Sequence, residues 1–204
     1  MNGRVAAVAA AVVAAAAGLA AGLLVAGGLL SSTVPAEGSA DAGFARDMQA
    51  HHAQAVEMAV LVRERTDDAE LRQVALDIEL TQQQQQGQMY GWLAVWGLPQ
   101  ASSAPAMAWA AGHGHDDTAA GDGPAMPGMA TRDEVAALRA AEGEAADRLF
   151  LELMITHHEG GVAMARSALD LAEQPAVRRL AQAVVDSQTA EIAVLEDLLA
   201  DVGS

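Results

Sequence analysis

The sequence contains no cysteine and no lysine, and only 3% of its 204 residues are aromatic. Without cysteine, the chain cannot form disulfides, thiolate nucleophiles, iron–sulfur clusters or cysteine-ligated zinc sites. Without lysine, it has neither a Schiff-base amine nor the lysine of a phosphate-binding loop. The scarcity of aromatic and β-branched residues disfavours sheets, because these residues fill strands. Any metal site must therefore use histidine, methionine, carboxylate or backbone ligands.

Alanine is the largest contributor to the 52% hydrophobic content, and this composition favours closely packed helices. The formal net charge is −16, from 27 acidic residues against 11 basic residues that are all arginine. Such a surface repels phosphate backbones and attracts cations, so no nucleic-acid partner is expected.

An uncharged stretch follows Arg4 and runs over residues 5–30, which is long enough to span a bilayer as a helix. Its positive flank lies on the N-terminal side, which predicts that the rest of the chain is exported. Residues 1–36 are then either a signal peptide, cleaved after Ala36, or an uncleaved signal anchor. Both alternatives place residues 37–204 in an extracytoplasmic or periplasmic location, anchored to the outer face of the cytoplasmic membrane or secreted.

The exported part repeats itself without gaps at an offset of 106 residues. The aligned residues are Asp41, Phe44, Met48, His51, His52, Val56, Met58 and Ala59 in the first copy and Asp147, Phe150, Met154, His157, His158, Val162, Met164 and Ala165 in the second. We assign repeat one to residues 41–98, a linker to 99–130 and repeat two to 131–204. Each repeat is one supersecondary unit that can bury its apolar face against the other.

Each repeat is predicted to form two long helices. The expected ranges are 41–65 and 68–96 in the first repeat, and 143–172 and 175–202 in the second, with Asp67 as an N-cap and Pro175 in a first turn. Thr131-Arg132-Asp133-Glu134 has the form of a capping box that begins a short helix, whereas the linker has no helical period. The predicted fold is all-α, an antiparallel four-helix bundle of two helical hairpins, preceded by the N-terminal membrane-spanning or signal helix.

Both repeats contain the motif D-x2-F-x3-M-x2-H-H-x5-M. At 100° per residue, Met48, His51 and Met58 share one face of a helix, and His52 lies at its edge. Each repeat thus presents two thioethers and one or two imidazoles on the stripe that faces the core. If the two helices cross near their histidines, His51 and His157 lie close enough to share one metal ion; if they cross elsewhere, each repeat binds separately. The helical angles leave both alternatives open.

Thioether and imidazole ligands without cysteine favour copper, with Cu(I) preferred, or silver as its mimic. The linker adds His113, His115, Met126 and Met129 as candidate ligands. Other interpretations stay open, because methionine often fills cores and buried histidines can simply form hydrogen bonds. Gly160-Gly161 indicates either close backbone approach or close helix packing, and glutamines 82–86 are expected on a solvated face.

No catalytic constellation is recognisable. A di-iron bundle needs Glu-x-x-His pairs, and no glutamate precedes a histidine by three positions. His158-Glu159 lacks the second histidine of a zinc protease motif. We therefore do not expect an enzyme, although a metal-dependent oxidase or reductase remains a weaker alternative.

The doubled motif, with Met-Pro-Gly-Met before its second copy, resembles the bacterial family called domain of unknown function 305 over residues 41–202. The resemblance implies a ferritin-like four-helix bundle, export or membrane anchoring, and copper or silver binding. It implies as metal-binding positions Met48, His51, His52, Met58, Met126, Met129, Met154, His157, His158 and Met164. The second copy is closer to the family pattern, because it has Glu159-Gly160-Gly161 where the first has Ala53-Gln54-Ala55. If only one repeat binds metal, we expect the second.

The sequence as a whole predicts an exported protein that buffers or delivers copper or silver through His/Met clusters. The alternative is a non-metal structural or interaction module on the outer face of the membrane. The expected partners are a metal ion and, through the N-terminal segment, the membrane; a copper-handling protein and a second copy of the chain are further candidates. From the ordinary histidine pKa of about 6.5, bound Cu(II) is expected to be lost as the pH falls through about 6.

Overall fold

The computed structural model describes residues 34–111 and 126–203. These residues form five α-helices, one short 3-10 helix and no strand, which confirms the all-helical prediction. The elements are α2 (Ala40–Arg63), α3 (Ala69–Trp96), η1 (Ala108–Ala110), α4 (Arg132–Ala140), α5 (Gly143–Leu171) and α6 (Pro175–Asp201). Residues 1–33 of the predicted signal peptide or anchor lie outside the described residues, as do the linker residues His113 and His115. Among the helices that are described, none combines the length and apolarity that a membrane span requires.

The helix ends follow local capping chemistry. The N-cap of α3 is Asp68 rather than Asp67, because the Asp68 carboxylate accepts hydrogen bonds from the backbone of Glu70 and Leu71. Thr131 forms the predicted capping box at the start of α4. The expectation that the linker has no helix is wrong over a single turn, because η1 lies within it.

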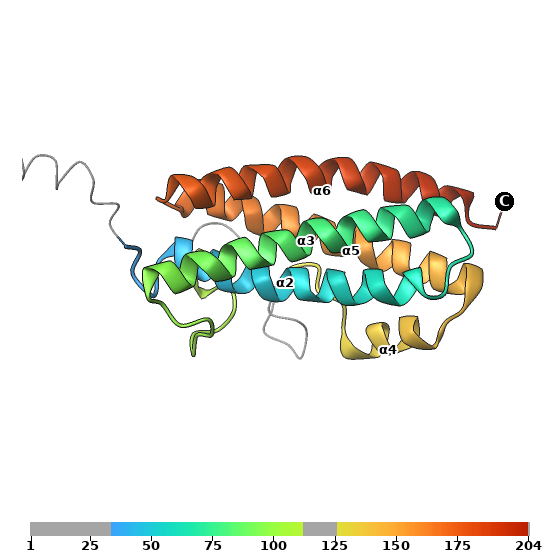
Figure 1. The fold of residues 1–204 in the computed structure, drawn as a ribbon, viewed down its shortest axis with the longest axis horizontal. Helices are drawn as coiled ribbons and strands as arrows, with labels where there is room; N and C mark the ends of the chain where they lie inside the picture. The colour runs from blue at the N-terminus through green and yellow to red at the C-terminus, as the bar shows by residue number, and fades with distance from the viewer. Residues whose placement is uncertain (1–33, 112–125, 204) are drawn as a thin grey trace, which may run out of the picture. The chain divides into compact units, whose positions relative to one another are not determined.

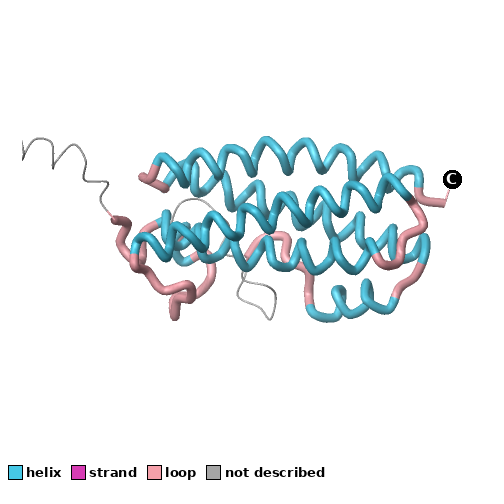
Figure 2. Tube along the Cα trace, in the orientation of Figure 1, coloured by secondary structure: helices cyan, strands magenta, loops and turns pink. Residues whose placement is uncertain are grey.

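The four long helices form two hairpins, α2 with α3 and α5 with α6, as Figures 1 and 2 show. The hairpins contact each other chiefly through α2 and α5. These two helices bury about twice as many residues as α3 and α6, so their faces form the centre of the fold. The histidine pairs lie on these two central helices.

Reciprocal contacts relate the two hairpins. The buried carboxylate of Asp41 on α2 accepts hydrogen bonds from the backbone of Glu173 and Gln174, in the turn between α5 and α6. Its equivalent on α5, Asp147, lies near Thr66 in the turn between α2 and α3. The beginning of each central helix therefore meets the end of the other, which makes α2 and α5 antiparallel.

Two apolar clusters make up the core. One contains Met58 and Met154, and the other contains Met48 and Met164, so each cluster joins one motif methionine from each repeat. All four side chains are fully buried. Burying a methionine of this kind stabilises a fold by roughly 2–3 kcal/mol relative to leaving it exposed. Along each central helix, the histidine pair lies between the two motif methionines.

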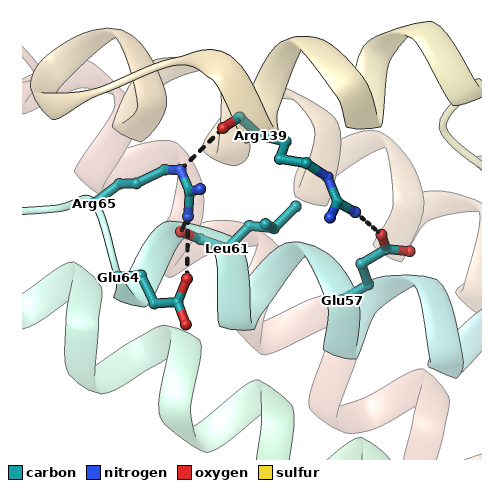
Figure 3. Close-up of polar contacts among 5 residues, drawn as sticks. All are labelled: Glu57, Leu61, Glu64, Arg65 and Arg139. Carbon is teal, nitrogen blue, oxygen red and sulfur yellow. Dashed lines mark hydrogen bonds and ion pairs between the residues drawn. The ribbon is translucent and has the colours of Figure 1, made fainter.

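Helix α4 covers the C-terminal end of α2 (Figure 3). The Arg139 guanidinium on α4 pairs with the Glu57 carboxylate on α2 at 2.5 Å, and Arg65 donates to the backbone oxygen of Arg139. Both partners of the ion pair are largely exposed, so the pair contributes at most about 1 kcal/mol. Helix α4 is held mainly by Val135 and Leu138, which are buried in the core.

Candidate metal centre

The four motif histidines meet where α2 contacts α5. His51, His52, His157 and His158 are all fully buried. The rings of His51 and His157, which occupy equivalent positions in the two repeats, have their centroids 3.8 Å apart and their planes inclined by 35°. Each of these rings lies 6.4 Å from the ring of its sequence neighbour. Of the two alternatives that the helical angles left open, the structure has the one in which the helices cross near their histidines.

Three of the rings are fixed by hydrogen bonds from their Nε2 atoms. His52 donates to the side-chain oxygen of Gln85 at 2.7 Å, and His158 donates to the Glu191 carboxylate at 2.7 Å. His51 donates to the backbone oxygen of Pro127 at 3.0 Å. Each of these oxygens can only accept, so the proton lies on Nε2 and Nδ1 keeps its lone pair. A histidine held in this tautomer is the form that binds a metal through the other nitrogen.

Among the described residues, none of the four Nδ1 atoms has a hydrogen-bond partner, and in His157 the Nε2 atom has none either. The backbone of His51 lies near the His157 ring, but no contact between them has the geometry of a hydrogen bond. Leaving a buried polar atom unsatisfied costs about 1–3 kcal/mol, so such atoms are rare unless they have a use. Unpaired imidazole nitrogens in a buried core are available as metal ligands.

Burial keeps the rings neutral. Desolvation lowers the pKa of His51 to about 4 and that of His52 to about 3, and it lowers the pKa of His157 well below its ordinary value. The neighbouring rings act in the same direction, because two imidazolium ions would repel each other. At neutral pH these three rings carry no charge, which is the state that binds metal.

The segment Met126–Ala130 packs against both central helices next to His51. Pro127 accepts the hydrogen bond from His51, and the Gln54 amide on α2 bonds to both the N–H and the C=O of Ala130. Gly128 has a φ of 73° and packs against the backbone of Gly160. Gly160 therefore allows the backbone of this segment to approach α5 closely, which is one of the two interpretations that the sequence left open for Gly160-Gly161. Met126 and Met129 are half-buried, and Met126 packs against the cluster that contains Met48 and Met164.

Replacing Gly160 by alanine tests the position of this segment. The added Cβ would overlap the carbonyl group of Pro127, which is backbone and cannot rotate away. We expect the segment to shift, the hydrogen bond from His51 to be lost and the Cu(I) affinity to fall about tenfold. Competition with a Cu(I) chelator measures this. The matched control is Gly87→Ala. No described atom lies within 4 Å of the Cβ that this change adds, so the Cu(I) affinity of this variant should be unchanged. Equal affinities for both variants would contradict the predicted role of the segment.

Sequence reasoning missed the polar residues that α3 and α6 contribute. The expectation that glutamines 82–86 lie on a solvated face is wrong for Gln82 and Gln85, which are buried. Gln82 and its equivalent Gln188 leave both amide atoms without a partner, and Gln188 packs against Gly161. The available signal was the repeat itself, since an offset of 106 aligns Gln82 with Gln188 and Gln85 with Glu191.

The structure thus brings the four histidines together from both repeats, with the motif methionines buried in the clusters on either side. Within the described ranges, no three His, Asp or Glu side chains are placed to hold one metal ion. The linker histidines His113 and His115 are not among the described residues.

The family described as "Domain of unknown function (DUF305)" matches residues 41–199. A Streptomyces coelicolor DUF305 protein, provisionally described as secreted, is 47% identical with a TM-score of 0.74, and the match covers 83% of this chain and 97% of that one. A DUF305 fragment from Deinococcus radiodurans is 37% identical with a TM-score of 0.64, covering 79% of this chain and 95% of that one.

A third solved structure is CopM in its Cu(II)-bound form, which is 27% identical with a TM-score of 0.61, covering 79% of this chain and 96% of that one. Cu(I)- and silver-bound forms of CopM match at 24% and 22% identity, where the likeness concerns the fold alone. The comparison with curated proteins gives no match.

Proposed function

The chain belongs to the family called domain of unknown function 305, and from this premise we propose that it is an exported protein that binds copper, or silver, to buffer or deliver it. The observation that carries the proposal is the set of four buried histidines whose Nδ1 atoms have no hydrogen-bond partner within the described part of the chain. Burial without hydrogen bonds is costly for each of these atoms, and a bound metal ion would repay that cost.

Methionine sulfur gives the proposed site its preference for copper. The four motif methionines are buried in the two clusters that flank the histidines. Met126 and Met129 belong to the segment Met126–Ala130, which packs against both central helices. Soft thioether ligands bind Cu(I) and Ag(I) in preference to Zn(II). The proposed ligand set is Met48, His51, His52, Met58, Met126, Met129, Met154, His157, His158 and Met164.

Access to the site sets how copper would be exchanged. The four histidine rings have no exposed surface, so an ion can reach them only when part of the covering structure moves. The half-buried Met126 and Met129 are the soft ligands nearest to solvent and would meet the ion first. The net charge of −16 raises the local concentration of cations around the protein.

The similar proteins support the proposal in two respects. CopM has been solved with copper, and its Cu(II)-bound form is 27% identical to this chain. The Streptomyces coelicolor relative is described as a secreted protein, which supports export. We further propose that the two hairpins form a ferritin-like four-helix bundle over residues 37–204 and that residues 1–36 are the export signal or membrane anchor. A copper-handling partner protein and a homo-oligomer remain part of the proposal.

Metal competition on the full-length protein tests this function. We expect Cu(I) and Ag(I) to bind at least about tenfold more tightly than Zn(II), because sulfur ligands discriminate between them. The measurement is competition against a Cu(I) chelator under reducing conditions, with a parallel titration against a zinc chelator. Tighter binding of Zn(II) would contradict the proposal. Absence of any metal binding would instead favour a structural or interaction module.

The pH at which copper is released follows from burial. Because the pKa of His51 lies at about 4 in the folded chain, protons compete for its ring only near that pH. The expectation from the ordinary histidine pKa, that Cu(II) is lost near pH 6, is therefore revised downward. We expect Cu(II) to remain bound at about pH 5.5. Equilibrium dialysis over a pH series measures this, and release of half of the Cu(II) near pH 6 would contradict it.

A further inference from the structure

The two repeats support their histidines with different chemical groups. His52 is bonded to Gln85 and His158 to Glu191, and in both repeats the partner comes 33 residues after the histidine. Both bonds run from Nε2 to a side-chain oxygen at 2.7 Å. The geometry is thus the same in the two repeats, but one acceptor is a neutral amide and the other a carboxylate.

No arginine neutralises the Glu191 carboxylate within the described part of the chain, where it accepts the hydrogen bond from His158. The Glu191 side chain is 27% exposed, whereas the His158 ring that it contacts is fully buried. The negative charge therefore acts on the ring from the edge of the core, opposite the free Nδ1 atom. Screening by solvent is weaker there than at the surface.

We infer that Glu191 is a specificity-determining residue, which makes the second repeat bind Cu(II) more tightly relative to Cu(I) than the first repeat does. This inference rests on the proposed copper-binding function. A carboxylate that accepts the Nε2 proton makes the ring a stronger donor at Nδ1. Its charge also attracts a doubly charged ion about twice as strongly as a singly charged one at the same distance.

The motif ligands of the two repeats are otherwise matched. Each repeat contributes two histidines and two buried methionines at equivalent positions. The difference at Gln85 and Glu191 therefore acts on equal ligand sets. Its consequence is that the ratio of Cu(II) to Cu(I) affinity is higher in the second repeat than in the first.

The test uses the variant that makes the second repeat like the first. In Glu191→Gln the amide oxygen still accepts from His158, as Gln85 does from His52, and only the charge is removed. We expect the Cu(II) affinity of the full-length protein to fall about tenfold relative to its Cu(I) affinity. For a one-electron couple, this tenfold change in the ratio of the two affinities raises the midpoint potential of the bound copper by about 59 mV. The reverse change, Gln85→Glu, should move the ratio in the opposite direction.

The matched control is Glu196→Gln, which removes the same charge from an exposed position of the same helix and should leave both affinities unchanged. If Glu191 only orients the ring, Glu191→Gln will leave the ratio and the potential at their wild-type values, and the inference is overturned. If the wild-type protein binds neither ion, the proposed function fails and the inference fails with it. A fall in the ratio that Glu196→Gln reproduces would also overturn it.

Discussion

Replacing both His157 and His158 by alanine should lower the Cu(I) affinity by on the order of 100-fold or more. Changing a group that merely supports a metal ligand already costs about 10–100-fold, and this change removes the ligands themselves. Neither ring nitrogen of His157 has a hydrogen-bond partner among the described residues, so both are available to a metal ion. Competition titration of Cu(I) measures the loss, and circular dichroism of the same samples checks that the helices remain.

The matched variant replaces His51 and His52 by alanine. We expect a smaller loss, because His157 remains and because the second repeat, with Glu159-Gly160-Gly161 after its histidines, is closer to the family pattern than the first. Equal losses from the two double variants would instead indicate one ion shared across the 3.8 Å contact between His51 and His157. If neither variant loses affinity while both stay helical, the histidines are structural and the metal interpretation is wrong.

The metal-free protein should lose much of its stability in mild acid. The pKa of His51 is about 4 and that of His52 about 3 in the folded chain, against about 6.5 when unfolded. Between those values the unfolded chain binds protons that the folded chain does not, so protonation favours unfolding. The stability is fully present above about pH 6.5 and is lost as the pH falls toward 4. His51 alone accounts for on the order of 3 kcal/mol over that window.

Urea unfolding in the presence of a chelator measures the effect, for example at about pH 7.5, 6 and 5. The raised pKa of Asp147, caused mainly by its burial, acts in the opposite direction, because there the folded chain binds the proton more readily. A His52→Gln variant should show a shallower decline, since glutamine does not titrate. A free energy of unfolding that stays constant from pH 7.5 to 5 would show that the rings are not held neutral by burial.

The sequence was sufficient to predict which face of each central helix is buried. The angular spacing of Met48, His51 and Met58 follows from helix geometry alone, and all three side chains are fully buried. The crossing point was not predictable, because it depends on how far the two hairpins slide along each other. In the structure, Asp41 contacts the turn at Glu173 and Gln174, and this contact sets the position of one hairpin along the other. The sequence gives no sign of this contact.

The partners of the histidine rings were missed for a related reason. The pairing of His52 with Gln85 depends on the length of the turn between α2 and α3, which a helical period does not give. The expectation for glutamines 82–86 also fails on geometry, because five consecutive helical residues extend around the whole circumference. At least one of them must then face the core, and the structure buries Gln82 and Gln85.

X-ray absorption spectroscopy of the Cu(I)-loaded full-length protein tests the central claim most directly. The claim is that copper binds in the core between the two repeats, where imidazole nitrogen and thioether sulfur are both available. We expect the copper to have both nitrogen and sulfur neighbours, and we expect the nitrogen contribution to decrease in the variant that lacks His157 and His158. A spectrum without sulfur, or one that this variant leaves unchanged, would contradict the claim.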